Sequence, residues 1–105
     1  MCTGHLNTRA PIEVAGNDAQ CAELTALLAR RAAARTVIFG GDVNRRPSCA
    51  PDDFWTRTDA SAGQAPGLQH VYGSGALRTP SAAVVSATHS DHDVLLVHAH
   101  LTARR

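Results

Sequence analysis

The chain has 105 residues, which is enough for one domain of ordinary size and too few for two. Hydrophobic residues make up 44% of it and charged residues 18%, close to the values of globular proteins, which argues against collagen-like or low-complexity sequence. A formal net charge of +1 provides no large basic field that would by itself imply nonspecific binding to nucleic acid or membranes.

Neither a membrane span nor a secretory signal is predicted. Apolar runs such as Val94-Leu95-Leu96-Val97 stop far short of the roughly 20 residues that a spanning helix needs. The N-terminus lacks a basic stretch followed by an apolar core, so the sequence as written carries no signal peptide. Whether Met1 is the true start stays open.

The first predicted elements are a short strand and a long helix. Residues 2–6 are partly apolar and precede a polar segment closed by Pro11, which indicates a strand that runs into a loop. Asn17 and Gln20 resemble a capping box. Apolar side chains then recur at helical spacing, at Cys21, Leu24, Leu27 and Leu28. The pattern predicts an amphipathic helix over residues 18–34.

The rest of the chain predicts strands separated by polar loops. Residues 36–39 are β-branched and aromatic, as in a strand buried on both faces, and Gly40-Gly41 is expected to end it. A helix followed by a buried strand implies layered packing. A short helix is expected over residues 51–56, with Phe54 and Trp55 packing inward. A surface loop over 59–67 and three further strands, over 68–74, 82–88 and 93–101, complete the prediction.

Three cysteines, Cys2, Cys21 and Cys49, are far apart and form no CxxC pair. The sequence therefore contains neither a zinc ribbon nor a thioredoxin-type redox motif. An odd count leaves at least one thiol unpaired within the chain. Two interpretations stay open: one intramolecular disulfide in an oxidising compartment, or buried thiols without chemistry.

The first candidate chemical motif is Gly40-Gly41-Asp42-Val43-Asn44, directly after the buried strand. Side chains two residues apart in an extended chain point the same way, so Asp42 and Asn44 are expected to face one ligand from a rigid strand end. The acid can orient a water molecule, and the amide can hold an oxyanion. A plain turn is the alternative, since Gly, Asp and Asn are turn formers.

The second candidate motif is Thr88-His89-Ser90-Asp91-His92-Asp93, before the last predicted strand. An aspartate beside a histidine can fix its tautomer and raise its basicity, which makes His92 with Asp91 a candidate proton carrier or phosphate ligand. One alternative is a solvated loop without function. Another is a zinc site built from histidines, namely His89, His92, His98 and His100.

A lone His5 at the end of the first strand says little, but the ordered set of motifs carries a resemblance. The set is Thr3-Gly4-His5-Leu6, a Gln-bearing helix, Gly41-Asp42-Val43-Asn44 with Pro47 after it, and Ser90-Asp91-His92. In this order, from His5 to Leu101, the chain resembles the C-terminal part of the endonuclease/exonuclease/phosphatase family of DNase I-like enzymes.

The resemblance implies an α+β fold, the DNase I-like four-layer αββα sandwich, of which residues 1–105 form a single partial domain. It implies hydrolysis of a phosphodiester or phosphomonoester, with Mg²⁺ or Mn²⁺ as cofactor. In that scheme Asp42 orients the attacking water, while His5, Asn44 and His92 contact the phosphate. Asp91 orients His92 and reaches the metal.

Two departures from the family pattern add an alternative. The family's N-terminal half, with the Glu that is its main metal ligand, has no counterpart, and Gln69 stands where an Asp is usual. An amide lacks the negative charge that a hard cation prefers. The sequence therefore predicts a truncated domain that self-associates through exposed sheet edges. The alternative function is a non-catalytic remnant or an interaction module that binds phosphate-bearing ligands.

Substrate and location are not fixed by the sequence. Arg45 and Arg46 could contact any phosphate or solvent, so nucleic acid, inositol phosphate and phospholipid headgroup all stay open as substrates. Relatives with cysteines near the positions of Cys2 and Cys49 are often extracellular. The resemblance thus suggests an extracellular protein if the full-length gene encodes a signal peptide, and a cytoplasmic one otherwise.

Overall fold

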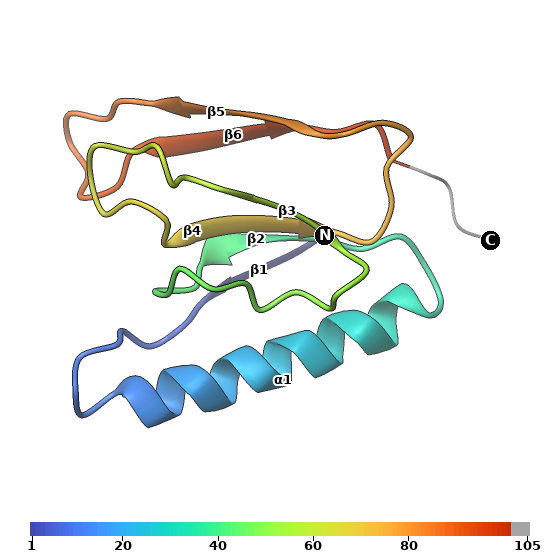
Figure 1. Ribbon diagram of the computed structural model, residues 1–105, viewed down its shortest axis with the longest axis horizontal. Helices are drawn as coiled ribbons and strands as arrows, with labels where there is room; N and C mark the ends of the chain where they lie inside the picture. Colours follow the sequence, from blue (N-terminus) through green and yellow to red (C-terminus); the bar gives the residue numbers. More distant parts are fainter. Residues whose placement is uncertain (102–105) are drawn as a thin grey trace.

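A computed structural model describes residues 1–101 as a helix, a four-stranded sheet and a two-stranded sheet stacked in that order (Figure 1). The helix α1 spans Val14–Ala32. The larger sheet has the order β1-β2-β4-β3, with β1 at Cys2–His5, β2 at Ile38–Asp42, β3 at Trp55–Thr58 and β4 at Gln69–Gly73. The smaller sheet pairs β5 (Ser81–Val85) with β6 (Val94–His98). The predicted α+β class is confirmed.

Helix α1 begins earlier than the sequence predicts, and the capping-box assignment is wrong. Asn17 lies in the first turn and is fully buried. Its side-chain amide donates to the carbonyl oxygens of Asn7 (2.7 Å) and Val43 (2.9 Å), so it joins the helix to two loops rather than capping it. The apolar spacing itself is confirmed, because Cys21 and Leu28 face the core.

Strand β2 runs through both glycines that were expected to end it. The pairing of β2 with β1 is parallel and sets Gly4 opposite Gly41. A Cβ on Gly41 would overlap the carbonyl oxygen of Gly4. The glycine therefore permits a close approach of two backbones, and the strand continues as far as Asp42.

A strand, rather than the predicted helix over 51–56, occupies the segment after the second loop. A single turn closes with a hydrogen bond from the Phe54 N–H to the Pro51 carbonyl (3.0 Å), and β3 starts at the next residue. The tryptophan ring of β3 lies over Gly73 of β4, where a Cβ would overlap it. Pairing with β4 thus overrides the local helix signal, while Phe54 is buried as expected.

The core lies between α1 and the larger sheet, where Phe39 and Tyr72 stack with ring centroids 5.4 Å apart. On the smaller sheet, side chains alternate as predicted for the last strand. Leu95 and Val97 are half-buried against the larger sheet, whereas Leu96 is 56% exposed on the outer face. Within residues 1–101, no helix has the length and apolar character needed to span a bilayer.

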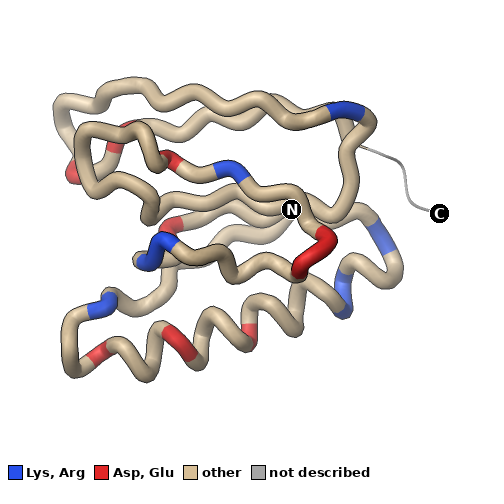
Figure 2. The backbone as a smooth tube through the Cα atoms, viewed as in Figure 1, with Lys and Arg blue, Asp and Glu red and all other residues tan. Residues whose placement is uncertain are grey.

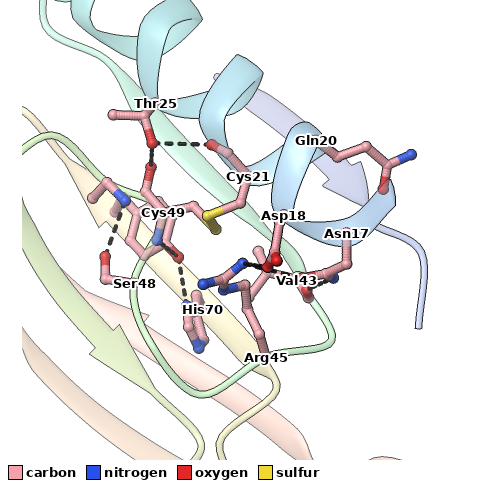
Figure 3. Close-up of a disulfide and its surroundings, with 12 residues drawn as sticks. Asn17, Asp18, Gln20, Cys21, Thr25, Val43, Arg45, Ser48, Cys49 and His70 are labelled. Carbon is pink, nitrogen blue, oxygen red and sulfur yellow. Dashed lines mark hydrogen bonds and ion pairs between the residues drawn. A yellow bond between two sulfur atoms is a disulfide. The ribbon is translucent and has the colours of Figure 1, made fainter. Parts of the chain in front are cut away.

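A disulfide joins Cys21 of α1 to Cys49 in the loop after β2, with Cα atoms 5.2 Å apart (Figure 3). The Thr25 hydroxyl donates to the carbonyl oxygens of both cysteines, at 3.0 Å for Cys21 and 2.6 Å for Cys49. The sequence left open whether a disulfide forms and which thiols pair. The third cysteine, Cys2, is free and half-buried.

Breaking the disulfide should destabilise the fold substantially. The linked cysteines are 28 residues apart, and closing a loop of that size lowers the entropy of the unfolded chain by an amount worth about 3 to 4 kcal/mol. We expect the double variant Cys21→Ala/Cys49→Ala to lose about that free energy of unfolding in urea. Cys2→Ser is the control and should change it by less than about 1 kcal/mol. Equal stabilities of the double variant and the parent would contradict the structural role.

Candidate functional site

The strand register lines up three polar residues at one end of the larger sheet. Parallel pairing sets His5 beside Asp42, and antiparallel pairing sets Asp42 beside Gln69. His5 ends β1, Asp42 ends β2 and Gln69 begins β4. Backbone hydrogen bonds on both sides of β2 therefore fix this row of three residues. A row held in this way is a rigid platform for side-chain chemistry.

The Asp42 carboxylate is the centre of the candidate site. Its Oδ2 lies 3.0 Å from His92 Nε2 and 3.6 Å from His5 Nε2. Its Oδ1 accepts the backbone N–H of Asn44 at 2.8 Å. The side chains of Asp42 and His92 are only 16% and 23% exposed, whereas that of His5 is 73% exposed. The structure thus brings together residues from three segments that are far apart in the sequence.

The geometry around His92 favours one tautomer. Nε2 lies 3.0 Å from Asp42 Oδ2, so a proton on this nitrogen faces a carboxylate. Nδ1 is buried and has no hydrogen-bond partner in the described chain. A proton on Nδ1 would be a buried donor without an acceptor, which is costly. His92 is therefore oriented by Asp42 and keeps Nδ1 as an unused proton acceptor.

Asn44 does not face the same way as Asp42, contrary to the expectation for an extended pair. Its φ of 53° lies in the left-handed region, which turns the chain out of the strand direction. Its side-chain amide donates to the carbonyl oxygen of Leu6 at 2.8 Å and so ties this turn to the end of β1. The turn interpretation of the motif therefore describes the backbone correctly.

Asp91 is exposed and has no hydrogen bond or ion pair within residues 1–101, so the structure does not bring it to His92. Asp93 is the buried acid of this motif. Its carboxylate accepts hydrogen bonds from Gly63 N–H (2.9 Å), Gln64 Nε2 (3.1 Å) and Ala87 N–H (3.2 Å). These donors, Ala87 first, lower the pKa of Asp93. The hydrogen bonds fix the loop that carries His92.

Gln69 is a structural donor rather than a free amide. Its Nε2 donates to Asp59 Oδ2 (2.8 Å) and to the Asp93 carbonyl oxygen (2.6 Å). Asp59 is fully buried, so the prediction that the loop over 59–67 begins at the surface is wrong at this residue. A carboxylate at position 69 could donate neither hydrogen bond, which gives a physical reason for an amide there.

His70 and Tyr72 form a satisfied buried network behind this row. His70 Nε2 lies 2.8 Å from the Gly67 carbonyl oxygen, and Nδ1 lies 2.5 Å from the Tyr72 hydroxyl, which also accepts the N–H of Cys49 (2.9 Å). The pattern fits a neutral imidazole that donates from Nε2 and accepts at Nδ1. Burial lowers the pKa of His70 and raises that of Tyr72.

The residues present do not fit the Mg²⁺ or Mn²⁺ that the resemblance implies. These ions prefer oxygen ligands and carboxylates, but only Asp42 offers a carboxylate here, and its two oxygens already face Asn44 N–H and two imidazoles. The oxygens of Asp59 and Asp93 are occupied by N–H donors. No group of three or more His, Cys, Asp or Glu in the described part of the chain could hold a metal ion, zinc included.

Comparisons with protein-family models, curated proteins and solved structures found no match. Functional interpretation therefore depends on the geometry and the sequence motifs. Two positioning residues were missed by the sequence analysis, namely Asp59 and Asp93. Asp93 lies inside a motif that was noticed, but nothing local distinguishes a buried acid from the exposed Asp91 beside it.

Gln69→Glu should be destabilising, although it restores an acid to this row. The change removes both side-chain donors and sets a second carboxylate against buried Asp59. We expect a loss of at least about 2 kcal/mol in the free energy of unfolding, measured in urea. Gln20→Glu is the matched control, because the Gln20 side chain accepts the Asn7 N–H and donates no hydrogen bond within residues 1–101, and a carboxylate can accept in the same way. Equal effects of the two substitutions would contradict the donor role of Gln69.

The free energy of unfolding should fall as the pH drops below the ordinary pKa of a histidine, because of His70. The unfolded chain takes up a proton near pH 6.5 that the buried imidazole resists, so the unfolded state gains up to about 1.4 kcal/mol per pH unit below that point. We expect His70→Gln to reduce this slope between pH 7.5 and about 5.5 in urea unfolding. His98→Gln, at an exposed position of β6, should keep the parental slope. Unchanged slopes in both variants would show that His70 does not carry the effect.

Proposed function

We propose that the protein acts on phosphate esters as a member of the endonuclease/exonuclease/phosphatase family. His5, Asp42 and His92 are the part of the active site that this chain carries, and Asn44 holds the turn beside them. The observation that supports the proposal most is the convergence of two imidazoles on Oδ2 of Asp42, at 3.0 Å and 3.6 Å. These are the residues of the motifs that carry the family resemblance, and no two of the three motifs are adjacent in the chain.

In this proposal the Asp42–His92 pair manages the proton of the attacking water. Water attacks the phosphorus atom, its proton passes to the pair, and the bond from phosphorus to the ester oxygen breaks. The pair then gives up a proton to the leaving oxygen as the alcohol departs, which returns Asp42 and His92 to their starting protonation. The exposed His5 imidazole contacts a phosphate oxygen from the other side of the carboxylate.

The DNase I-like sandwich is the architecture that we propose around this site. Three of its layers are consistent with the stacking of α1, the larger sheet and the smaller sheet (Figure 1). A fourth layer would cover the outer face of the smaller sheet, where Val85, Val94 and Leu96 are each 45–56% exposed. Self-association through this face or through open strand edges remains our expectation for the isolated chain.

Binding of phosphate esters without cleavage is a second candidate function. It is favoured by the small number of carboxylates near the site that are free to bind a cation. Two of the three least exposed carboxylates near the site, those of Asp59 and Asp93, are occupied by hydrogen bonds that hold loops together. Gln69 supplies hydrogen bonds where an acid would supply negative charge. A site whose remaining carboxylate, that of Asp42, faces two imidazoles can bind and orient an ester but offers few ligands to a cation.

The test is hydrolysis of bis-p-nitrophenyl phosphate, with and without added Mg²⁺ or Mn²⁺. We expect Asp42→Asn and His92→Ala to lower the rate about hundredfold or more, because each removes one member of the pair that handles the proton. Asp91→Asn should change the rate less than about threefold, since Asp91 is exposed and forms no hydrogen bond or ion pair with Asp42 or His92.

His98→Ala controls for the loss of an exposed imidazole. Equal losses in Asp91→Asn and Asp42→Asn would contradict the assigned centre. No turnover above background, together with calorimetric binding of the same ester that Asp42→Asn or His92→Ala weakens, would instead support the binding module.

A further inference from the structure

Two exposed histidines lie next to each other on the outer face of the smaller sheet. His98 ends β6 and His100 follows two residues later, so both side chains leave the chain on the same side. Their ring centroids are 4.9 Å apart, and the ring planes are inclined by 57°. Of the four histidines that the sequence offered as zinc ligands, these two are the pair that the fold brings into ring contact.

The backbone under this pair is held on the side of β5. His98 pairs with Ser81 at the last step of the ladder between β5 and β6. The carbonyl oxygen of His100 accepts the N–H of Leu77 at 2.6 Å, which extends the contact beyond the end of β6. The two imidazoles therefore project from a fixed stretch of backbone, which lowers the entropic cost of binding a ligand between them.

Both imidazoles are free to bind a ligand. Neither forms a hydrogen bond or an ion pair in the part of the chain that the structure describes. His70, by contrast, uses both ring nitrogens inside the core, and His92 faces the Asp42 carboxylate. The rings of His98 and His100 can therefore turn their nitrogens toward one ion without breaking a hydrogen bond.

The separation of the two rings suits a chelate. Imidazole nitrogens bind metal ions at about 2.0–2.1 Å, and the angle at the ion is about 90° in octahedral and about 109° in tetrahedral sites. These values place the centres of two ligating rings roughly 4.5 to 5.3 Å apart. The observed 4.9 Å lies within this range, so the rings need not move apart or together for one ion to bind both.

The side chains on this sheet select the kind of ion. Neither β5 nor β6 carries an Asp, Glu, Lys or Arg, and Figure 2 shows both strands without charged residues. Hard cations such as Mg²⁺ prefer oxygen ligands, which the two imidazoles do not supply. Late first-row transition metals such as Ni²⁺ and Cu²⁺ bind well to imidazole nitrogen. The pair therefore suits an ion of this second class.

We propose that His98 and His100 chelate one late first-row transition-metal ion, with Ni²⁺ and Cu²⁺ bound more tightly than Mn²⁺. Two protein ligands leave the other coordination positions of the ion to water, which an external ligand can replace. The site does not depend on the proposed function. His92, which contacts Asp42, lies before the first residue of β6, whereas this pair lies at and beyond its last residue.

Calorimetric titration of the full chain with Ni²⁺ tests the site. We expect one ion per chain, and at least about tenfold weaker binding in both His98→Ala and His100→Ala, because a single imidazole cannot chelate. Mn²⁺ should bind the parent at least about tenfold more weakly than Ni²⁺. His89→Ala is the matched control, since it removes an exposed imidazole from the loop before β6 and should change the affinity less than about twofold.

A shifted pair separates chelation from the general effect of losing a histidine. Leu96 precedes His98 by two residues and is exposed on the same outer face. Leu96→His in the His100→Ala background therefore restores two imidazoles at the same spacing. We expect this double variant to recover most of the lost affinity for Ni²⁺. Circular dichroism checks that each variant is folded.

Three results would overturn the chelate. One is an equal affinity of His89→Ala and His98→Ala for Ni²⁺, or of the parent for Mn²⁺ and Ni²⁺. Another is a loss of binding in His92→Ala without a loss in His100→Ala, which would assign the ion to the candidate active site. The third is a ratio of one ion to two chains, which would replace the site within one chain by a bridge between two copies.

Discussion

The parallel pairing of β1 with β2 is the interaction on which the candidate site depends. It brings His5 level with Asp42 and leaves the carboxylate at the end of a strand supported on both sides. That pairing needs glycine at position 41, where the backbone of Gly4 occupies the space of a side chain. The glycines before the acid are thus part of the site's construction, although they carry no chemistry of their own.

A second layer of hydrogen bonds determines where the loops around that strand end can lie. The Asp93 carboxylate accepts N–H donors from two loops that are separated in the chain, at Gly63 and at Ala87. The Asp59 carboxylate accepts the backbone and side-chain N–H groups of Gln69, whose amide also donates to the backbone carbonyl of Asp93. Acids used in this way rigidify the loop that presents His92 to Asp42. Because their oxygens accept these hydrogen bonds, the carboxylates of Asp59 and Asp93 are not free to bind a cation. The hydrogen bonds that make the loops rigid therefore lower the affinity of this site for a metal ion.

Local signals predicted helix α1 and a strand near β2, but not how the site is assembled. The strand was expected to be buried on both faces, whereas Phe39 is the one buried residue of the five in β2. The spacing around Cys21 and Leu28 is a property of one helix face and can be read from the sequence. The roles of Asn17 and Asp59 depend on partners far away in the chain, so their local appearance as a cap and as a loop residue was misleading. The passage of β2 through Gly41 likewise depends on the backbone of another strand.

The disulfide makes the position of the loop after β2 depend on the redox conditions around the protein. Cys49 ends the loop that carries Arg45 and Arg46, and Cys21 belongs to the helix that carries Asp18. The covalent bond therefore sets the separation between the basic loop and the acid that organises it. Disulfides persist in oxidising compartments and are reduced in the cytosol. In a molecule that keeps this bond, the loop that carries Arg45 is held beside Asp18 by a covalent bond, whereas in a reduced molecule only noncovalent contacts hold it there.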